Sequence, residues 1–288
     1  IGVKPGLKSV TERLQDAGYE VILAGKSHVK PNSVFNWNHY FGSIKHRYLP
    51  LEKIDNYLKN SKKPFCLFIT SDYPHGPYPK TTKYSKKDIY KLPYHKGNVK
   101  NHMPGYYKNI EDDNTQLGKI LKMVDTYGLR NNSMFIYASD HGMSGKWGLS
   151  EQGLKVPFIV RWPNHIQPNT TSNTLLTFVD VLPTFLEASG SSIPKNLDGV
   201  SLKAQITGEV NTLKTYAVSQ YPRKNKMGYS FRTKEYRYTV WINEKKSTVL
   251  IFKEDIHAEE LYDYKNDPLE TENKIDNDRE MDMYVNRL

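Results

Sequence analysis

The chain has 288 residues, and its content of 38% hydrophobic and 25% charged residues is typical of a globular protein with one or two domains. No apolar run approaches the roughly 20 residues that a membrane-spanning helix requires, so no membrane span is expected. Lysine and arginine (41) outnumber aspartate and glutamate (31), which gives a net charge of +10. This balance favours an anionic partner such as nucleic acid, an acidic membrane surface or a sulfated polysaccharide, although a solvated lysine-rich surface would have the same composition.

The single cysteine, Cys66, excludes an internal disulfide. It lies in an apolar run, 65–69, without the spacing of a metal ligand set, so we predict a buried and inert thiol. The sequence begins with Ile1 and shows no charged segment followed by an apolar one, as a secretory signal would. These patterns therefore do not indicate the cellular compartment.

The first two thirds of the chain alternate between helical and strand-like patterns. Apolar residues at helical spacing predict helices over 7–18, 51–59, 111–127 and 177–188, and short apolar runs predict strands over 19–24, 65–70, 133–139 and 156–161. This alternation indicates an α/β fold with a mostly parallel sheet flanked by helices. The aperiodic segment 72–105, rich in Pro, Tyr, Lys and His, is predicted to be a long surface loop over a site.

The pattern changes after about residue 210. Short runs rich in Tyr, Val and Thr predict strands over 216–220, 229–233, 236–242 and 248–252, with a hairpin loop at 243–246 and a last helix from about Glu270. We therefore expect an α/β domain over residues 1–210. A small antiparallel, β-rich subdomain with a terminal helix should follow over 211–288.

Polar residues that could carry chemistry follow three of the predicted strands. Asp140 and His141 come directly after the strand 133–139, and a carboxylate beside an imidazole can share a metal ion, although a plain Ser-Asp turn has the same residues. Lys26 and His28 follow the strand 19–24, and as residues two apart in an extended segment they face the same side. One cation and one proton carrier there suit anion binding and acid–base work, unless both are ordinary loop residues.

His75 follows the strand 65–70 and stands between two prolines, which restrict its backbone. Ligands of open α/β sheets bind beyond the carboxyl ends of parallel strands. If the sheet is parallel, these three segments meet at one edge. Lys146, a few residues beyond His141, could then hold an anion beside the metal. The sequence thus predicts a site for a doubly charged oxyanion.

Five motifs in the same order resemble the type I sulfatases of the alkaline phosphatase-like superfamily. SDHGMSGKWGLSEQGLKVPFIVRWP (139–163) is similar to the metal-and-lysine segment of that family, AGYEVILAGKSH (17–28) to its "aGY-t-liGKwH" segment, and DYPHGPY (72–78) to its "PH-P" segment. TFVDVLPTFLEASG (177–190) resembles a downstream helix of the family, and ELYDYKNDPLETEN (260–273) its C-terminal signature. The likeness runs from about residue 7 to 275. MGYSFRTKEYRYTVW and DIHAEELYDYKNDP are most similar to the iduronate-2-sulfatase branch.

The resemblance implies hydrolysis of a sulfate ester on an anionic glycan, with calcium and a formylglycine residue as the family's cofactors. Asp140 and His141 would bind Ca²⁺. Lys26 and His28 would contact the hydrated aldehyde. His75 and Lys146 would hold the sulfate and the leaving oxygen, where cations stabilise developing charge. Five residues are candidates for substrate binding, although they would serve equally as parts of the small sheet: Gln220, Tyr221, Arg223, Arg232 and His257.

One part of the family pattern is missing from the printed sequence. The N-terminal strand with paired aspartates is absent, as is the Cys/Ser-x-Pro/Ala-x-Arg motif whose first residue becomes formylglycine, and Cys66 lies in no such motif. We therefore expect the chain to be either an N-terminally truncated fragment, whose partner would be the missing segment or another chain, or a degenerate member. In both cases its calcium site should be incomplete and turnover by this chain alone absent. Relatives of this kind are secreted, periplasmic or lysosomal.

Two alternatives remain at this level. A phosphodiester or phosphonate hydrolase of the same superfamily would keep a similar scaffold but use more carboxylate and histidine ligands for two metals. A non-catalytic module that binds polyanions or glycans would fit the net charge of +10 and the missing nucleophile. Nucleic acid is not expected as a partner, because no RNP, zinc-finger or helix-turn-helix signature is present.

Overall fold

The computed structural model describes residues 3–4, 6–43, 47–91, 99–142, 148–243 and 253–275, with the side chain of Lys253 left aside. Its contacts divide the chain into two compact units, which are described separately. Unit 1 comprises Ile1–Asn132 and Phe185–Pro194, and unit 2 comprises Ser133–Thr184 and Lys195–Leu288. These units reflect compactness within the fold, and the domain boundary expected at residue 210 stays a prediction.

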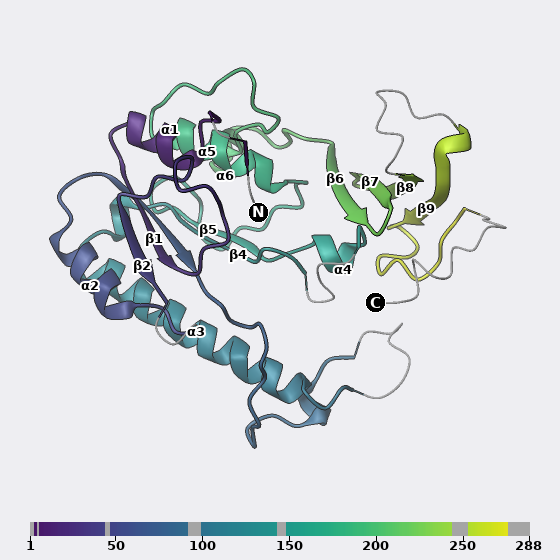
Figure 1. Cartoon of the computed structure of the whole chain (residues 1–288), viewed down its shortest axis with the longest axis horizontal. Coiled ribbons are helices and arrows are strands. Elements are labelled where there is room, and N and C mark those ends of the chain that lie inside the picture. The colour runs from purple at the N-terminus through teal and green to yellow at the C-terminus, as the bar shows by residue number, and fades with distance from the viewer. Residues whose placement is uncertain are drawn as a thin grey trace. The chain divides into compact units, whose positions relative to one another are not determined.

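Unit 1 is built on a three-stranded parallel sheet in the order β2-β1-β3. Its strands are β1 (Glu20–Gly25), β2 (His39–Gly42) and β3 (Phe65–Thr70), and its α-helices are α1 (Val10–Asp16), α2 (Leu51–Asn60) and α3 (Met103–Thr126) (Figure 1). Leu23 of β1 pairs with Tyr40 on one side and Phe68 on the other. β1 lies in the middle of the sheet and is buried almost throughout. Because β1 and β3 are parallel neighbours, with Gly25 opposite Thr70, their carboxyl ends meet at one edge of the sheet.

The long helix α3 starts earlier than predicted, and its buried face includes polar as well as apolar residues. It begins at Met103, eight residues earlier than expected, with Pro104 in its first turn, where a missing N–H costs nothing. Ile120 of the predicted helix is buried, whereas Ile110, which precedes the predicted range, is 43% exposed. The buried face also carries polar residues, among them Asn109 and Gln116, and these bond to neighbouring loops. The apolar pattern therefore indicated the packed side of this helix but not the polar residues on it.

In unit 2, β4 (Phe135–Ala138) and β5 (Phe158–Arg161) pair antiparallel, with Phe135 opposite Arg161. The sheet was predicted to be mostly parallel, and this pair is an antiparallel exception. Adjacent parallel strands need a crossover that carries the chain back, usually through a long helix. The connection here contains only the four-residue helix α4 (Glu151–Leu154) among its described residues.

A four-stranded antiparallel sheet forms the other part of unit 2, as predicted for the C-terminal subdomain. Its order is β6 (Tyr216–Arg223), β7 (Lys226–Thr233), β8 (Tyr236–Asn243) and β9 (Ile256–Asp263). One face buries Trp241 and Ala258 against Leu149, with Leu154 of α4 and Tyr221 packed around them. The predicted strand 248–252 and most of the hairpin loop 243–246 lie outside the described residues. Glu270, where a last helix was expected, has a φ of 56°, which no helix allows, and the chain beyond 275 is not described.

The remaining helices of the described residues are short: η1 (Lys86–Asp88), η2 (Arg130–Asn132), η3 (Phe178–Asp180), α5 (Val181–Ala188), α6 (Lys203–Ile206) and η5 (Lys253–Asp255). The predicted helix 177–188 is thus confirmed as η3 followed by α5. Asp180, fully buried, accepts hydrogen bonds from the amides of Thr177 and Val200 and pairs with Lys214 at 2.8 Å. None of the helices within the described ranges is both long and apolar enough to cross a membrane.

Candidate active site

The carboxyl ends of β1 and β3 are joined tightly at the position of Lys26. The Lys26 amide donates to the carbonyl of Thr70 at 3.1 Å, and the Thr70 hydroxyl donates to the carbonyl of Lys26 at 2.6 Å. Gly25 has a φ of 110°, and a Cβ there would overlap the Thr70 carbonyl, so only glycine fits. The Lys26 ammonium then donates to Asp72 at 2.8 Å. Two motifs that lie 46 residues apart in sequence therefore meet through this ion pair.

The loop that carries His75 is fixed by backbone contacts from three directions. Its own turn closes through the His75 amide, which donates to the carbonyl of Asp72 at 3.1 Å. Arg47 donates to the carbonyls of His75 (2.6 Å) and Pro77 (2.8 Å). Asn109, buried on α3, donates to the His75 carbonyl at 3.1 Å. These bonds place the histidine without engaging its ring.

The His75 side chain is exposed, and its Nδ1 lies 2.8 Å from the carbonyl oxygen of Gly76. A proton on Nδ1 donated to that oxygen leaves Nε2 as the nitrogen that can accept a proton or bind a ligand. His28 is likewise exposed and lies just beyond Lys26. Unit 1 thus presents one cation and two imidazoles along the edge formed by the ends of β1 and β3.

Asp140 and His141 lie in unit 2, just after β4. The Asp140 side chain is 84% exposed, and its carboxylate lies 3.7 Å from His141 Nε2. His141 Nδ1 lies 2.9 Å from the carbonyl oxygen of Gly142. The Gly142 amide in turn donates to the carbonyl of Gly153 in α4 at 2.9 Å. The short helix therefore holds the turn that presents both candidate ligands.

These two residues fit part of a calcium site. A carboxylate open to solvent and an imidazole with its Nε2 turned toward that carboxylate are suitable donors, but Ca²⁺ takes six to eight oxygen ligands. Within the described part of the chain, no group of three or more His, Cys, Asp or Glu side chains is placed to hold a metal ion. Asp140 and His141 can thus supply two donors and leave most of the coordination shell to other groups.

The structure therefore brings together some of the predicted site residues. Lys26 and the His75 loop meet through Asp72 in unit 1, and Asp140 and His141 are neighbours in unit 2. Lys146 lies outside the described residues. The convergence of all six residues in one pocket stays a prediction.

The five candidate substrate-binding residues lie on the C-terminal sheet but do not share one face. Gln220 is exposed on one side of β6, while Tyr221 faces the buried side and packs on the Trp241 core. Arg232 lies over the ring of Tyr264, 3.4 Å from its centroid, and 3.5 Å from Glu151. The remaining two, Arg223 and His257, are half-buried and have partners. The contacts of Arg232 with Tyr264 and Glu151 are those of a residue that stabilises the fold. A role in substrate binding stays a prediction for all five residues.

A charged network that sequence reasoning missed connects α4 to this sheet. The Arg237 guanidinium, whose side chain is 3% exposed, donates to Glu270 (2.7 Å), Glu151 (2.5 Å) and the Ser230 hydroxyl (3.1 Å). Burial opposes ionisation of Glu151, but Arg237 and Arg232 outweigh it and hold the pKa of that carboxyl below its ordinary value. The helix α4, to which the turn after β4 is bonded through Gly142, is therefore anchored to the C-terminal sheet.

Sequence reasoning also missed Asp72, Arg47 and Asn109. Asp72 lies in the DYPHGPY motif, three residues before His75, so the sequence offered its carboxylate as a candidate. Arg47 and Asn109 act through contacts about 30 residues distant in the chain, which no local pattern reveals. For Cys66, burial raises the pKa of the thiol to about 12, in keeping with the predicted inert cysteine.

The parallel sheet of unit 1 and the antiparallel C-terminal sheet of unit 2 are parts of an alkaline phosphatase-like fold, which solved sulfatase structures share. The chain belongs to the sulfatase family. The Sulfatase family model matches residues 2–191, and the model of the N-sulphoglucosamine sulphohydrolase C-terminal region matches residues 139–288. The fold class and the family expected from the five motifs are both confirmed.

Two curated relatives show how far the similarity extends. An ulvan-active sulfatase of Formosa agariphila is 40% identical over 96% of this chain and 62% of its own length. Human iduronate 2-sulfatase is 26% identical over 62% of this chain and 45% of its own length. The iduronate-2-sulfatase likeness noted in the sequence is therefore present but weaker than that to the ulvan-active enzyme. This chain spans less than two thirds of either relative.

Solved structures share the fold at low sequence identity. A protein crystallised with its substrate, D-glucosamine-2-N,6-O-disulfate, has a TM-score of 0.72 and 20% identity over 94% of this chain and 78% of its own. A phosphonate monoester hydrolase from Silicibacter pomeroyi also has a TM-score of 0.72, with 14% identity over 99% of this chain and 79% of its own. The fold by itself therefore accommodates more than one ester chemistry.

Proposed function

We propose that this chain is the larger part of a sulfuric ester hydrolase that acts on a sulfated carbohydrate. The observation that carries the proposal is the ion pair between Lys26 and Asp72, which joins two family motifs at one sheet edge. Family membership and the sulfated substrates named for relatives support it. The basic surface, with a net charge of +10, suits the same anionic substrate.

In this proposal each residue acts through its charge or its proton. Lys26, kept in place by Asp72, supplies positive charge next to the reacting group. His75 offers Nε2 as a proton donor or acceptor at the leaving oxygen, and His28 serves as a second proton carrier. Lys146 adds a further cation for the sulfate oxygens. Positive groups fixed in advance around a developing negative charge are usually the largest contribution to catalysis.

Sulfatases generally use a formylglycine residue and Ca²⁺. When bound, the metal supplies positive charge that neutralises sulfate oxygens. Asp140 and His141 are the residues of this chain that would bind it. The printed sequence holds no Cys/Ser-x-Pro/Ala-x-Arg motif, so the formylglycine would come from a segment outside it. We propose that the chain functions together with such a segment.

The test is a chimera in which this chain replaces the matching region of the Formosa agariphila sulfatase. We expect the chimera to release sulfate from ulvan oligosaccharides and from an aryl sulfate. Lys26→Ala or His75→Ala should lower kcat about 10²–10³-fold, as removal of one charged or proton-transferring group does. The chain alone should show no turnover.

One control variant and three contrary outcomes make this test decisive. Lys59→Ala, an exposed lysine of α2 away from the site, should leave the chimera's kcat unchanged. Turnover by the chain alone, retained in Cys66→Ala, would contradict the expected need for an outside nucleophile. A chimera that hydrolyses a phosphonate monoester faster than the aryl sulfate would favour the phosphonate hydrolase alternative, and one that only binds would favour the non-catalytic module.

We also expect this chain to bind calcium weakly or not at all, because affinity follows the number and charge of the oxygen ligands. Isothermal titration of the chain with CaCl₂ should give no saturation in the micromolar range typical of sensor sites. The chimera, which carries the relative's additional ligands, should bind more tightly and lose that gain in Asp140→Ala. Micromolar binding by the chain alone, abolished in Asp140→Ala, would show that the site is complete and that our assignment of ligands is wrong.

A further inference from the structure

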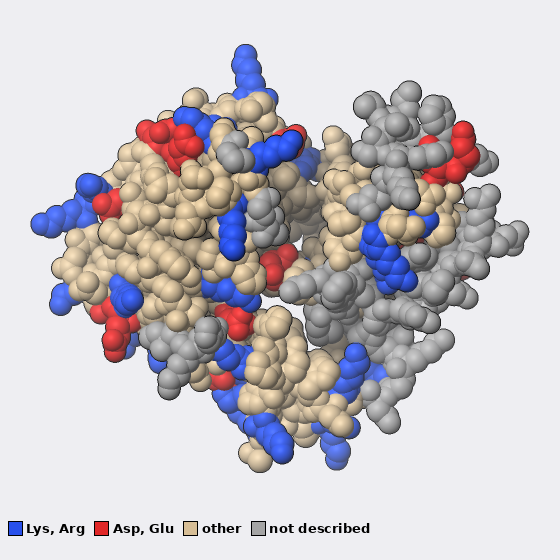
Figure 2. Space-filling view, in the orientation of Figure 1, with Lys and Arg blue, Asp and Glu red and all other residues tan. Residues whose placement is uncertain are grey.

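A lysine-rich part of unit 1 has no role in the proposed chemistry. We call it the lysine arm and define it as residues 78–91 and 99–107, at the N-terminal end of α3 (Figure 1). It holds six lysines and one acidic residue, so 23 of the 288 residues carry a charge of +5, half of the chain's net +10. Blue side chains gather over this lower part of the molecule in Figure 2.

The lysine arm is a folded element within unit 1. A Cβ on Gly105 of α3 would overlap the carbonyl oxygen of Pro79, so the two backbones touch. The Tyr90 amide donates to the hydroxyl of Tyr107 at 3.2 Å, and Tyr84 packs edge-on to the same ring. A charge run that is merely solvated needs no such anchors. The positions of its lysines are therefore set by the fold.

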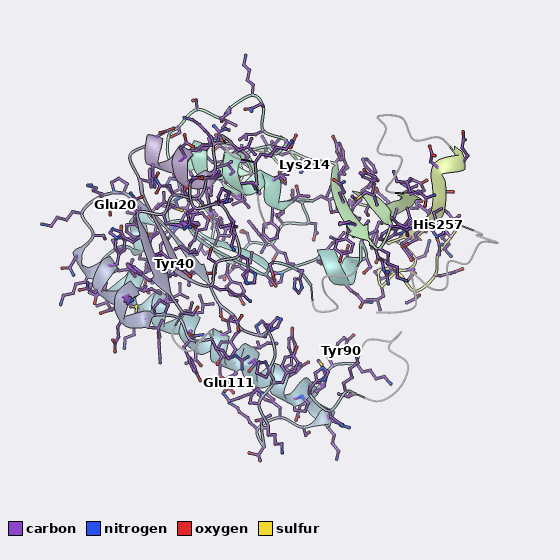
Figure 3. The ribbon with its side chains drawn as sticks, in the orientation of Figure 1. Glu20, Tyr40, Tyr90, Glu111, Lys214 and His257 are labelled. Atoms are coloured by element: carbon purple, nitrogen blue, oxygen red, sulfur yellow. The ribbon has the colours of Figure 1, made fainter. Side chains whose placement is uncertain are left out.

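Five of the six lysines lack a carboxylate partner within the part of the chain that the structure describes. Asp88, the arm's one acidic residue, accepts hydrogen bonds from the amide and hydroxyl of Ser85. Glu111, on α3 beside the arm, pairs with Lys83 (Figure 3). The others are exposed and make no ion pair with any residue in the described ranges: Lys80, Lys86, Lys87, Lys91 and Lys100. The ammonium groups of these lysines repel one another, and an anion bound among them would relieve this repulsion.

Aromatic rings are interleaved with these cations. Tyr90 is 71% exposed at the outer part of the arm (Figure 3). Tyr78 is also exposed and stacks on His102 with 5.0 Å between ring centroids. Tyrosine and histidine rings offer an apolar face with a polar edge. Ammonium groups next to such faces match a sugar ring that carries sulfate groups, because the ring packs on the aromatic face while the sulfates meet the lysines.

The lysine arm also continues directly from the candidate active site. Tyr78 comes three residues after His75, and Arg47 fixes the intervening Pro77 through its carbonyl. A polysaccharide bound along the lysine arm would therefore extend away from the ester that is hydrolysed. We propose that the lysine arm binds a sulfated polysaccharide at sugar units beyond the one that is hydrolysed, so that the substrate is a polymer. This inference rests on the proposed function for the site from which the arm extends.

Binding can be measured with the chain as it is, because no turnover is needed. The probe is dextran sulfate, titrated into the chain at several salt concentrations, with neutral dextran and poly(U) as comparisons. A fourfold variant of the arm replaces Lys80, Lys86, Lys87 and Lys91 by glutamine. The matched control replaces Lys53, Lys59, Lys62 and Lys122, which are equally exposed, and removes the same charge elsewhere in unit 1.

We expect the arm variant to lose at least about tenfold in affinity for dextran sulfate and to show a flatter salt dependence, while the control loses less than about threefold. Tyr90→Ala should weaken binding several-fold and Tyr90→Phe should not. Equal losses in both fourfold variants would overturn the proposal, since binding would then follow net charge alone. Binding of poly(U) as tight as that of dextran sulfate would overturn it in favour of a nucleic-acid surface.

Catalysis separates this inference from the proposed function. In the chimera, the arm variant should lower kcat/KM for polymeric ulvan at least about tenfold, in line with its loss of affinity, and leave kcat/KM for an aryl sulfate unchanged. Equal losses on both substrates would contradict a role confined to the polymer. A chimera without sulfatase activity, whose parent chain still binds dextran sulfate through the arm, would contradict the proposed function and leave the binding surface standing.

Discussion

Replacing Arg237 by methionine should lower the free energy of unfolding of unit 2 by about 3–5 kcal/mol, the cost of removing one partner from a buried charge cluster. Methionine retains most of the packing volume but leaves Glu151 and Glu270 without their shared cation. Both carboxylates then remain partly or wholly buried with fewer hydrogen bonds. Urea denaturation followed by tryptophan fluorescence measures the change, since Trp241 lies in the same sheet.

The pH dependence gives this prediction a second readout. Because the pKa of Glu151 is lowered by the two arginines, its ion pairs stabilise the fold above its ordinary pKa of 4.5 and are lost as the pH falls through the lower folded value. The difference between wild type and Arg237→Met should therefore shrink below about pH 4. Lys155→Met is the control, because Lys155 is 3.7 Å from Glu151 but largely exposed and should contribute less than about 1 kcal/mol. Equal effects of the two variants would contradict the assignment.

Gly142→Ala should cost about 3 kcal/mol, at the upper end for an added methyl group in a packed site. A Cβ there would overlap the carbonyl of Gln152 and lie 3.1 Å from that of Lys155. These are backbone atoms of α4 and its end, so relief requires moving the helix or breaking the bond from Gly142 to Gly153. The same displacement would move His141, and in the chimera we expect the gain in calcium affinity to fall with it.

Gly118→Ala is the matched control for that substitution. Gly118 lies within α3, and a Cβ added there would meet no atom of the described residues within 4 Å. Alanine should therefore raise stability by about 1 kcal/mol through its higher helix propensity. Opposite signs for the two glycines would support the close approach of Gly142 to α4. A Gly142→Ala variant as stable as wild type would show that this approach is looser than the structure indicates.

Patterns local to the chain predicted the elements around the candidate site well. The strand 65–70 was predicted with the bounds of β3, and the strand 19–24 lies within one residue of β1. Both are short apolar runs bounded by polar or glycine residues. A strand that is buried on both faces needs apolar residues at every position, so such a run indicates it directly. The motifs after these strands identified the family because their residues are close in sequence. Position along the chain was enough to place Lys26, His28 and His75 after the ends of β1 and β3, and their chemical roles stay predictions.

Contacts between distant segments decided what the sequence left open. The antiparallel pairing of β4 with β5 and the buried polar face of α3 depend on neighbours that no window of sequence contains. The same holds for Arg47 and Asn109, which secure the His75 loop through its backbone carbonyls. A carbonyl is present at every residue, so sequence cannot show which one a distant side chain will bind.

By itself, the sequence determined the family, the strands β1 and β3 and the residue types at their ends, because each follows from local spacing and burial. Only the tertiary structure decided that Asp72 pairs with Lys26, that Arg237 joins Glu151 to Glu270, and that most cations of the lysine arm form no ion pair with the described residues. Each of these features depends on whether charged side chains that are distant in sequence lie close together in the folded protein. Their energies depend on distance and burial, which only the folded chain sets.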